Sequence, residues 1–428
     1  MSRVSRAALT TRLQWLVLQL ERRLWIRAGA FSVLGVATAL ASAWIEGYIP
    51  ADMPAKIGAD AADNILNILA ASMLSVTIFS LSTVVAALGS ATCNASPRAT
   101  RLLTGDRIAQ NALATFLGSF LFALVGIVAL QAGFYGERGR VVLFVVTIAV
   151  IAAIVVTLLR WIDHVSRLGR VDETTDRVEA AAAAALRARH AEPWLGGVPF
   201  EPGDPLPAVT TPVYAARMGY VEHIDMDALS RLGDGRAVVY VTALPGAYVD
   251  PTCPLAHVAG EQDAAACGRV RQAFSVGTLR SFDQDPRFGV LVLAEIASRA
   301  LSPGTRDAGT PIDVIGRGCR LLATWAEPVE REAPPYPNVH VPPVLLGDLV
   351  ADLFDPIARD GAALVEVVLR LQRGLHTLAS LGDAALARHA GRCALRALAH
   401  AEAALVLDDD RGRVREAAAW AAAHAGTC

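Results

Sequence analysis

Lysine is almost absent from this chain of 428 residues, because Lys56 is the only one and every other cationic side chain of this kind is an arginine. Basic and acidic residues nearly balance, at 39 and 41, and the formal net charge is -2. A domain that binds nucleic acid normally carries a basic surface. We therefore expect no nucleic acid among the partners.

Cysteine is also scarce, and the six cysteines are scattered without a CxxC pair. Neither a zinc site nor a disulfide framework is indicated, so free thiols are expected. The HExxH, GxxxxGKS/T and GxSxG motifs of common hydrolases and nucleotide-binding enzymes are missing as well. We accordingly expect no enzyme activity, no metal site and no cofactor.

Apolar residues are abundant, at 54% of the chain, with a mean hydropathy of +0.40. A bilayer core of about 30 Å is crossed by about 20 mostly apolar helical residues. The predicted fold class is therefore an α-helical membrane protein, with a four-helix transmembrane bundle over residues 25–160 and the lipid bilayer as a partner. The four runs that meet the length requirement are 25–45, 65–88, 113–130 and 141–159.

The distribution of arginines predicts the orientation, because cationic loops tend to stay on the cytoplasmic face. Arginines precede the first run, follow the second at Arg98 and follow the fourth at Arg160, whereas the loop after the first run is mainly acidic. Both termini are therefore predicted to be cytoplasmic. Residues 1–24 read as an amphipathic juxtamembrane segment. A cleaved signal peptide ending near Ala43 is the alternative.

The second run is unusually polar, and Asn64, Asn67, Ser75 and Ser82 fall close to one face at helical spacing. Such a face either lines an aqueous path or contacts another helix through hydrogen bonds. We favour helix contact, because no intramembrane Asp, Glu, Lys or Arg marks an ion pathway.

The third run places small residues on a common face, among them Ala114, Gly118 and Gly126. Small residues let neighbouring helices approach closely in a membrane. This face therefore predicts tight helix packing.

Residues 161–192 continue the apolar spacing of the fourth run and predict a cytoplasmic helical stalk. A stretch rich in proline and glycine at 193–212 is a predicted linker. Short β-branched runs then predict a small β module at 213–260. The remainder, 261–428, is predicted to be a helical cytoplasmic domain, whose last helices cover 349–379, 383–407 and 411–424.

The run from Val238 through Pro245-Gly246 to Val258 resembles a half-motif of lipoyl and biotinyl domains. Those domains carry their cofactor on a lysine. Lys56 lies far away in a predicted outer loop, which excludes a covalent carrier role.

Residues 280–315 predict a helical hairpin. Asp283 or Asp285 can cap its first helix ahead of Pro286, Ser302-Pro303-Gly304 can end that helix, and Thr310-Pro311 can begin the next. The stretch FDQDPRFG that begins at Phe282, with ALSPG after it, resembles the signature of a bacterial family of predicted membrane proteins known as domain of unknown function 2254.

The resemblance extends to the loop after the second run, where Ser96, Pro97 and Arg98 match an inner-loop motif of that family. This chain departs from the family at Thr305 to Ala308, where Ile-Asn-Asp-Pro is more common. The resemblance implies a multi-pass protein of the bacterial inner membrane and implies no activity.

Charged residues cluster in the hairpin signature, and paired carboxylates beside arginines can bind a metal ion or phosphate. Acids at a helix start and a base near its end also complement the helix dipole, and we favour this structural interpretation. The residues concerned are Arg280, Asp283, Asp285, Arg299 and Asp307.

We hypothesise a homo-oligomeric channel, transporter or membrane sensor with a cytoplasmic regulatory domain. The sequence does not identify its small-molecule or ion ligand. A membrane-anchored scaffold is the alternative, and a membrane-tethered enzyme follows it.

Overall fold

The computed structural model describes residues 59–104, 106–133, 139–201, 203–329 and 333–426, with a few isolated positions between 29 and 37. The first predicted span and the amphipathic segment before it lie outside these residues almost entirely. The described residues form two compact units. We call Thr100–Glu173, with the described part of Met1–Cys93, the membrane unit, and Asn94–Ala99 with Thr174–Cys428 the carboxy-terminal unit.

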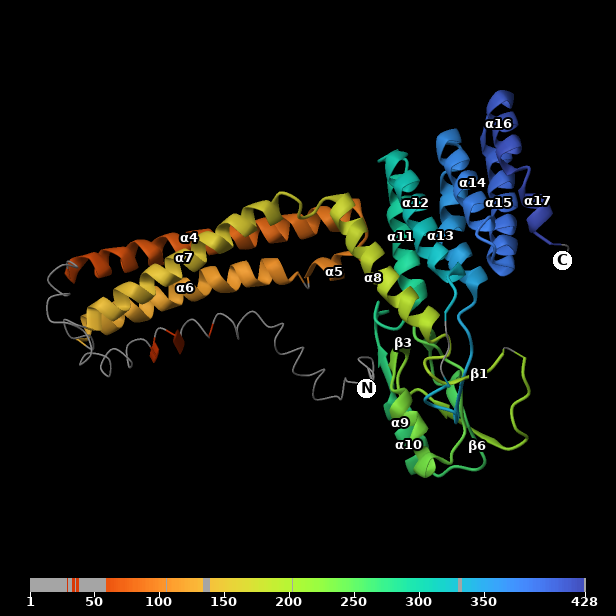
Figure 1. Ribbon diagram of the computed structural model, residues 1–428, viewed down its shortest axis with the longest axis horizontal. Coiled ribbons are helices and arrows are strands. Elements are labelled where there is room, and N and C mark those ends of the chain that lie inside the picture. Colours follow the sequence, from red (N-terminus) through yellow and green to blue (C-terminus); the bar gives the residue numbers. More distant parts are fainter. Residues whose placement is uncertain are drawn as a thin grey trace. The chain divides into compact units, whose positions relative to one another are not determined.

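The membrane unit contains three helices that are long and apolar enough to cross a bilayer, over Asp63–Cys93, Ile108–Gln131 and Gly139–Val165. These stretches confirm the second, third and fourth predicted spans as helices (Figure 1). The full helices are α4 (Ala59–Asn94), α6 (Arg107–Gln131) and α7 (Gly139–Val165), and the short α5 (Thr100–Thr104) precedes α6.

Close packing in this unit depends on the face of α6 that carries small residues. A Cβ atom added to Gly126 would lie 3.1 Å from Leu66 Cδ1 of α4 and 3.7 Å from Leu143 Cδ1 of α7. Ala114 and Ala123 are also buried, at 2% and 0% exposure. The predicted packing role of the small residues is confirmed.

The stalk is not a continuation of α7, so that prediction was wrong. α7 ends at Val165, and α8 (Val171–Ala191) begins after a turn. Gly169 in this turn has φ +83°, and an added Cβ would lie 2.9 Å from the carbonyl oxygen of Ala87 in α4. Only glycine combines this backbone conformation with that contact, so the helix breaks here.

The carboxy-terminal unit contains two small sheets. The five-stranded sheet has the order β1-β8-β4-β6-β2, and the three-stranded sheet has the order β5-β3-β7. The strands are β1 (Val198–Pro199), β2 (Thr210–Tyr214), β3 (Gly219–Ile224), β4 (Val239–Val241), β5 (Tyr248–Val249), β6 (Pro254–Ala259), β7 (Phe274–Gly277) and β8 (Val339–Val341).

The β module is larger than the predicted 213–260. β1 lies inside the predicted linker, and β7 lies beyond the predicted end. β8 pairs in parallel with β4 through Val339 and Val239, although a hundred residues separate them in the sequence. A short strand such as β8 pairs where its buried valines meet the core, which local sequence patterns do not reveal.

Two helices of this unit, α9 (Met226–Ser230) and α10 (Ala264–Ala273), lie beside the strands (Figure 1). The longer helices stand side by side, with α11 against α12 and α13, and α15 against α13 and α14. They are α11 (Pro286–Ala300), α12 (Gly309–Ala323), α13 (Leu346–Asp360), α14 (Val365–Ala379), α15 (Ala384–Ala404), α16 (Asp408–Ala418) and α17 (Ala421–His424), with short 3-10 turns at Leu232–Gly235 and Thr324–Ala326.

The predicted helix over 349–379 is in fact two helices, α13 and α14, which a turn at Gly361 separates. An added Cβ at Gly361 would lie 2.8 Å from Val367 Cγ1, so the turn is tight. The other two predicted helices correspond to α15 and to α16 with α17. Asp383 caps α15 by accepting a hydrogen bond from the backbone N–H of Leu386 at 2.7 Å.

Candidate functional site

Asp285 is the N-cap of α11, and it is one of the two residues, Asp283 or Asp285, that the sequence predicted for this role. Its Oδ1 accepts hydrogen bonds from the backbone N–H groups of Arg287, at 3.1 Å, and Phe288, at 3.2 Å. Pro286 occupies the first helical position, where a missing N–H has no cost. The residue is only 2% exposed, so its charge needs a close partner.

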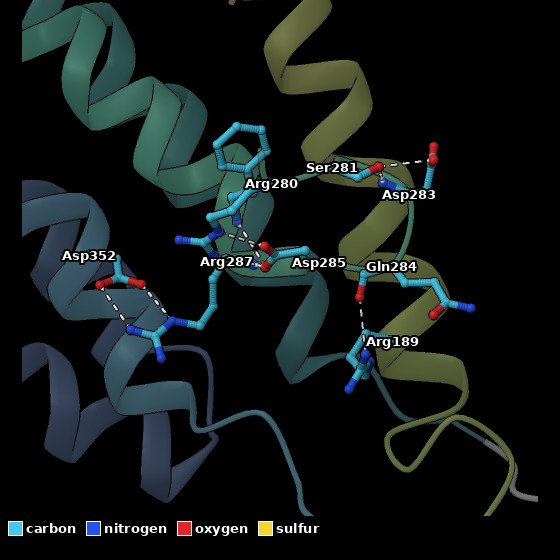
Figure 2. A network of polar contacts seen from close by, with 9 residues as sticks. Arg189, Arg280, Ser281, Asp283, Gln284, Asp285, Arg287 and Asp352 are labelled. Carbon is cyan, nitrogen blue, oxygen red and sulfur yellow. Dashed lines mark hydrogen bonds and ion pairs between the residues drawn. The ribbon is translucent and has the colours of Figure 1, made fainter. Parts of the chain in front are cut away.

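Arg280 is that partner, and Figure 2 shows its guanidinium facing the Asp285 carboxylate. The two side chains form a bidentate ion pair, with Nε–Oδ2 at 2.7 Å and Nη2–Oδ1 at 3.0 Å. The Arg280 guanidinium also lies 5.3 Å from the centre of the Phe288 ring. Gly246 covers the other side, because a Cβ added there would overlap the Asp285 carboxylate.

Arg189, near the end of α8, is a second arginine close to Asp285. It is 3% exposed, and its Nη2 donates a hydrogen bond to the carbonyl oxygen of Gln284 at 3.0 Å. Burial lowers the pKa of Arg189 to about 10, while the nearby charge of Asp285 opposes that shift. The Gln284 side chain in turn accepts a hydrogen bond from Ile224 N–H of β3 at 3.0 Å.

Arg287 extends the same network to α13. Its Nε and Nη2 donate to Asp352 at 2.7 and 3.1 Å (Figure 2). Its Nη1 donates to Asp348 at 2.6 Å. The hydrogen bond to Asp352 is the main cause that raises the pKa of Arg287 above its ordinary value. We call Arg189, Arg280, Asp285, Arg287 and Asp352 the α11 start network.

The predicted charged cluster does not come together at one site. Asp283 is exposed near the start of α11 and accepts a hydrogen bond from Ser281 at 2.9 Å. Arg299 lies in the last turn of the same helix, and Asp307 lies beyond it. A helix of 15 residues is about 22 Å long, which separates the two groups.

Asp307 serves the start of α12 instead. Its Oδ1 accepts hydrogen bonds from the N–H of Gly309 at 2.8 Å and of Thr310 at 3.3 Å, and its Oδ2 accepts one from the Thr310 hydroxyl at 2.6 Å. The Thr310 hydroxyl is the main cause that lowers the pKa of Asp307. Across the described ranges, no group of three or more His, Cys, Asp or Glu side chains is arranged to hold a metal ion.

The inner-loop motif, by contrast, has a direct partner in the hairpin. Ser96 donates a hydrogen bond to Glu295 Oε2 at 2.9 Å, and Arg98 forms an ion pair with Glu295 Oε1. The Ser96 hydroxyl also accepts a hydrogen bond from the Arg98 N–H at 3.1 Å. Pro97 stands between these two residues. The loop and α11 therefore meet at one carboxylate, which we call the Glu295 latch.

Sequence reasoning missed Arg189, Arg287 and Glu295. Glu295 had one available signal, since it is an acid in the middle of the apolar sequence of α11. Arg189 and Arg287 had no comparable signal, because arginines are common on exposed helix faces.

The polar face of α4 is exposed among the described residues. Asn67, Ser75 and Ser82 each donate to a carbonyl oxygen of their own helix four residues earlier, at 3.0 to 3.2 Å. Asn64 is exposed on the same side, and so is Phe79, at 71%. Within the described part of the membrane unit, α6 and α7 pack on the opposite side, where Leu66 and Met73 are buried. These four polar residues therefore lie on one exposed face of α4, and the described residues do not show what contacts that face.

A family model described as "Predicted membrane protein (DUF2254)" matches residues 21–377. No curated protein and no solved structure matches the chain. Because the match covers most of its length, the chain belongs to the DUF2254 family of predicted membrane proteins.

Proposed function

We propose that this member of the DUF2254 family is a membrane channel, transporter or sensor whose carboxy-terminal unit lies in the cytoplasm and governs the membrane helices. The observation that carries the proposal is the Glu295 latch. Residues Asn94–Ala99 join α4 to α5, and they belong to the compact carboxy-terminal unit although both flanking helices belong to the membrane unit. A movement of α11 would therefore act directly on the chain between two membrane helices.

The strength of the latch supports a reversible coupling. The Ser96 hydroxyl is buried, at 1% residue exposure, and donates to a charged acceptor, which makes its bond stronger than a neutral one. The Arg98 side chain is 57% exposed, so solvent screens its ion pair. Such a contact is strong enough to favour an arrangement in which the loop is bound to α11, and weak enough for the loop to be released.

The second stretch of chain that leaves the membrane unit supports the same proposal. α8, which follows the last membrane helix, is held to the hairpin of α11 and α12 inside the carboxy-terminal unit. Arg317 of α12 pairs with Glu179 of α8 at 2.7 Å, and Gly289 of α11 lies directly against Ala182. The hairpin thus holds both stretches of chain that leave the membrane unit.

A scaffold without transport is the second candidate, and one observation favours it. The hydroxyls of Ser75 and Ser82 are satisfied by carbonyl oxygens of their own helix. Such bonds allow these residues to face lipid or protein without an aqueous path.

The proposal is tested with the full chain in lipid vesicles by measuring K⁺ and Cl⁻ flux, because the natural solute is not identified. Glu295→Gln removes the charge of the latch, whereas Glu366→Gln makes the same change at an exposed position of α14. Loss of an interaction of about 1 kcal/mol shifts an equilibrium about fivefold. We expect Glu295→Gln to change the flux by about that factor and Glu366→Gln to leave it unchanged.

A parallel measurement follows thiol accessibility in a background without native cysteines. Ser75→Cys and Ser82→Cys should react with membrane-impermeant reagents if α4 lines a path, while Met73→Cys on the buried side should not. Absence of flux in every variant, together with protection of both cysteines, would favour the scaffold.

A further inference from the structure

One face of α15 is uncovered among the described residues of the carboxy-terminal unit, although the opposite face is packed. Leu386 and Ala394 on the packed face are buried against the neighbouring helices. The uncovered face carries Leu395, which is 38% exposed, and the exposed Ala399 and Ala403. We propose that this face binds the same face of a second copy of the chain, with the two α15 helices antiparallel. The inference does not rest on the function proposed above.

The uncovered face is continuous along the helix. It consists of exposed residues at intervals of three or four, namely Arg388, Arg392, Leu395, Ala399 and Ala403. Such intervals correspond to one face of a helix. Just beyond the end of α15, Val406 and Leu407 are 86% and 64% exposed. Contact of these apolar side chains with water is unfavourable, so their burial against a partner favours association. We call these seven residues the α15 strip.

Opposite charges lie at the two ends of the α15 strip. Arg388 and Arg392 lie near the start of α15, whereas Asp408, Asp409 and Asp410 directly follow the strip. α15 has 21 residues and is therefore about 31 Å long. The arginines at one end consequently cannot reach the carboxylates at the other end within one molecule.

The charges nearest the basic end do not neutralise it. Arg396, the next arginine of α15, is paired with Asp355 of α13 at 2.7 Å. Asp383 is engaged as the cap of α15, where its Oδ1 accepts a hydrogen bond from a backbone N–H. Within the part of the chain that the structure describes, Arg388 and Arg392 form no ion pair. Both guanidinium groups are therefore available to a partner.

The acidic end also retains charge that its own arginines do not cover. Asp408 pairs with Arg411 at 3.0 Å, yet its side chain is 94% exposed, and Asp410 pairs with Arg413 at 3.1 Å. Asp409 has no ion-pair partner in the described ranges. The three acids lie in the first turn of α16, where they complement the helix dipole. A carboxylate has several acceptor positions, so this local role leaves room for an arginine of another molecule.

A two-fold axis brings the opposite ends together. In an antiparallel pair the basic end of each copy meets the acidic end of the other, so the same contact forms twice. A parallel pair would instead place like charges together, which is unfavourable. An axis near Ala399 sets Leu395 of one copy beside Ala403 of the other, because both lie four residues from the axis. The small side chains of Ala399 and Ala403 allow the helices to approach closely.

The test is disulfide cross-linking of the full chain in lipid vesicles, in a background without native cysteines. Two cysteines can be joined only when their Cα atoms lie within about 7 Å of each other. Ala399→Cys lies at the proposed axis, so a mild oxidant should convert most of it into a linked dimer. His400→Cys is the control, because this exposed position is turned away from the α15 strip. It should remain monomeric.

Charge exchange in the Ala399→Cys protein tests the direction of the two helices. Arg388→Glu with Arg392→Glu should slow the cross-linking about tenfold or more, because like charges then meet across the contact. Adding Asp408→Arg and Asp409→Arg should restore the rate. Arg373→Glu, at an exposed position on α14, should leave the rate unchanged.

Three outcomes would overturn the proposal in protein that elutes as a single folded species. The first is a monomeric Ala399→Cys chain, which would leave the α15 strip to a different partner. The second is equal cross-linking at Ala399 and His400. The third is a loss of cross-linking in the glutamate variants that the aspartate-to-arginine exchange does not reverse.

Discussion

At the scale of single residues, two arginines beside Asp285 have different roles. Arg280 makes the bidentate pair that compensates the buried carboxylate. Arg189 makes no ion pair with it and is held instead by the Gln284 carbonyl. Because burial lowers the pKa of Arg189 to about 10, its charged form is less stable there than in water, although the group stays charged near neutral pH. Equal charge and similar location therefore do not imply equal contributions to stability.

This difference predicts unequal effects of the same substitution. Arg280→Gln removes the bidentate ion-pair partner of the buried Asp285 and should cost about 3 kcal/mol or more in the free energy of unfolding. Arg189→Gln removes a charge that burial already destabilises and keeps an amide donor, so we expect a change of about 1 kcal/mol or less. Chemical denaturation of the full chain measures both, with Arg269→Gln on the exposed side of α10 as control. Equal losses for the two variants would contradict this assignment.

At the scale of elements, the contact between α8 and α11 depends on the absence of a side chain at one position. A Cβ added to Gly289 would overlap the Cβ of Ala182. Glycine inside a helix is normally unfavourable, so its presence in α11 is explained by this close approach. The contact holds the helix that follows α7 against the hairpin that also carries Glu295.

Gly289→Ala should therefore destabilise the protein by about 1–3 kcal/mol through overpacking. Gly268→Ala is the matched control in α10, where an added Cβ meets nothing within 4 Å. That substitution should stabilise the protein by about 0.5–1 kcal/mol, because alanine is the better helix former. Adding Ala182→Gly to Gly289→Ala should recover part of the loss. The overlap at Gly289 would be refuted if Gly289→Ala and Gly268→Ala changed the free energy of unfolding in the same direction.

At the scale of the whole molecule, the chain leaves the membrane unit twice and enters the carboxy-terminal unit both times. The first passage is Asn94–Ala99, and the second begins at Thr174. A protein that needed only an anchor would require one such passage. The pair of passages is the architectural basis of the proposed coupling.

The orientation of these passages is predicted from arginine positions alone and can be measured directly. A reporter that is active only in the cytoplasm should give a signal when it is fused after Cys428. The same reporter inserted at Ala55, in the acidic loop after the first predicted span, should give none. Signal from Ala55 and silence at Cys428 would reverse the proposed orientation.

The sequence by itself determined the features that depend on neighbouring residues. Long apolar runs specified the three described membrane helices, because a bilayer demands length and hydropathy within one segment. The sequence placed the start of α11 at Pro286 with Asp283 or Asp285 as its cap, and Gly126 indicated close packing, for equally local reasons.

Only the tertiary structure decided which distant residues meet. β8 joins β4, Glu295 receives Ser96 and Arg98, and Asp106 meets His164 across long separations in sequence. The turn at Gly169 belongs to the same group, since its contact with Ala87 requires α4 to lie alongside. The sequence does not distinguish a charged side chain that is exposed to water from one that pairs with a distant residue. Its partner is selected by the packing of apolar faces, which brings particular charges within reach and removes their water.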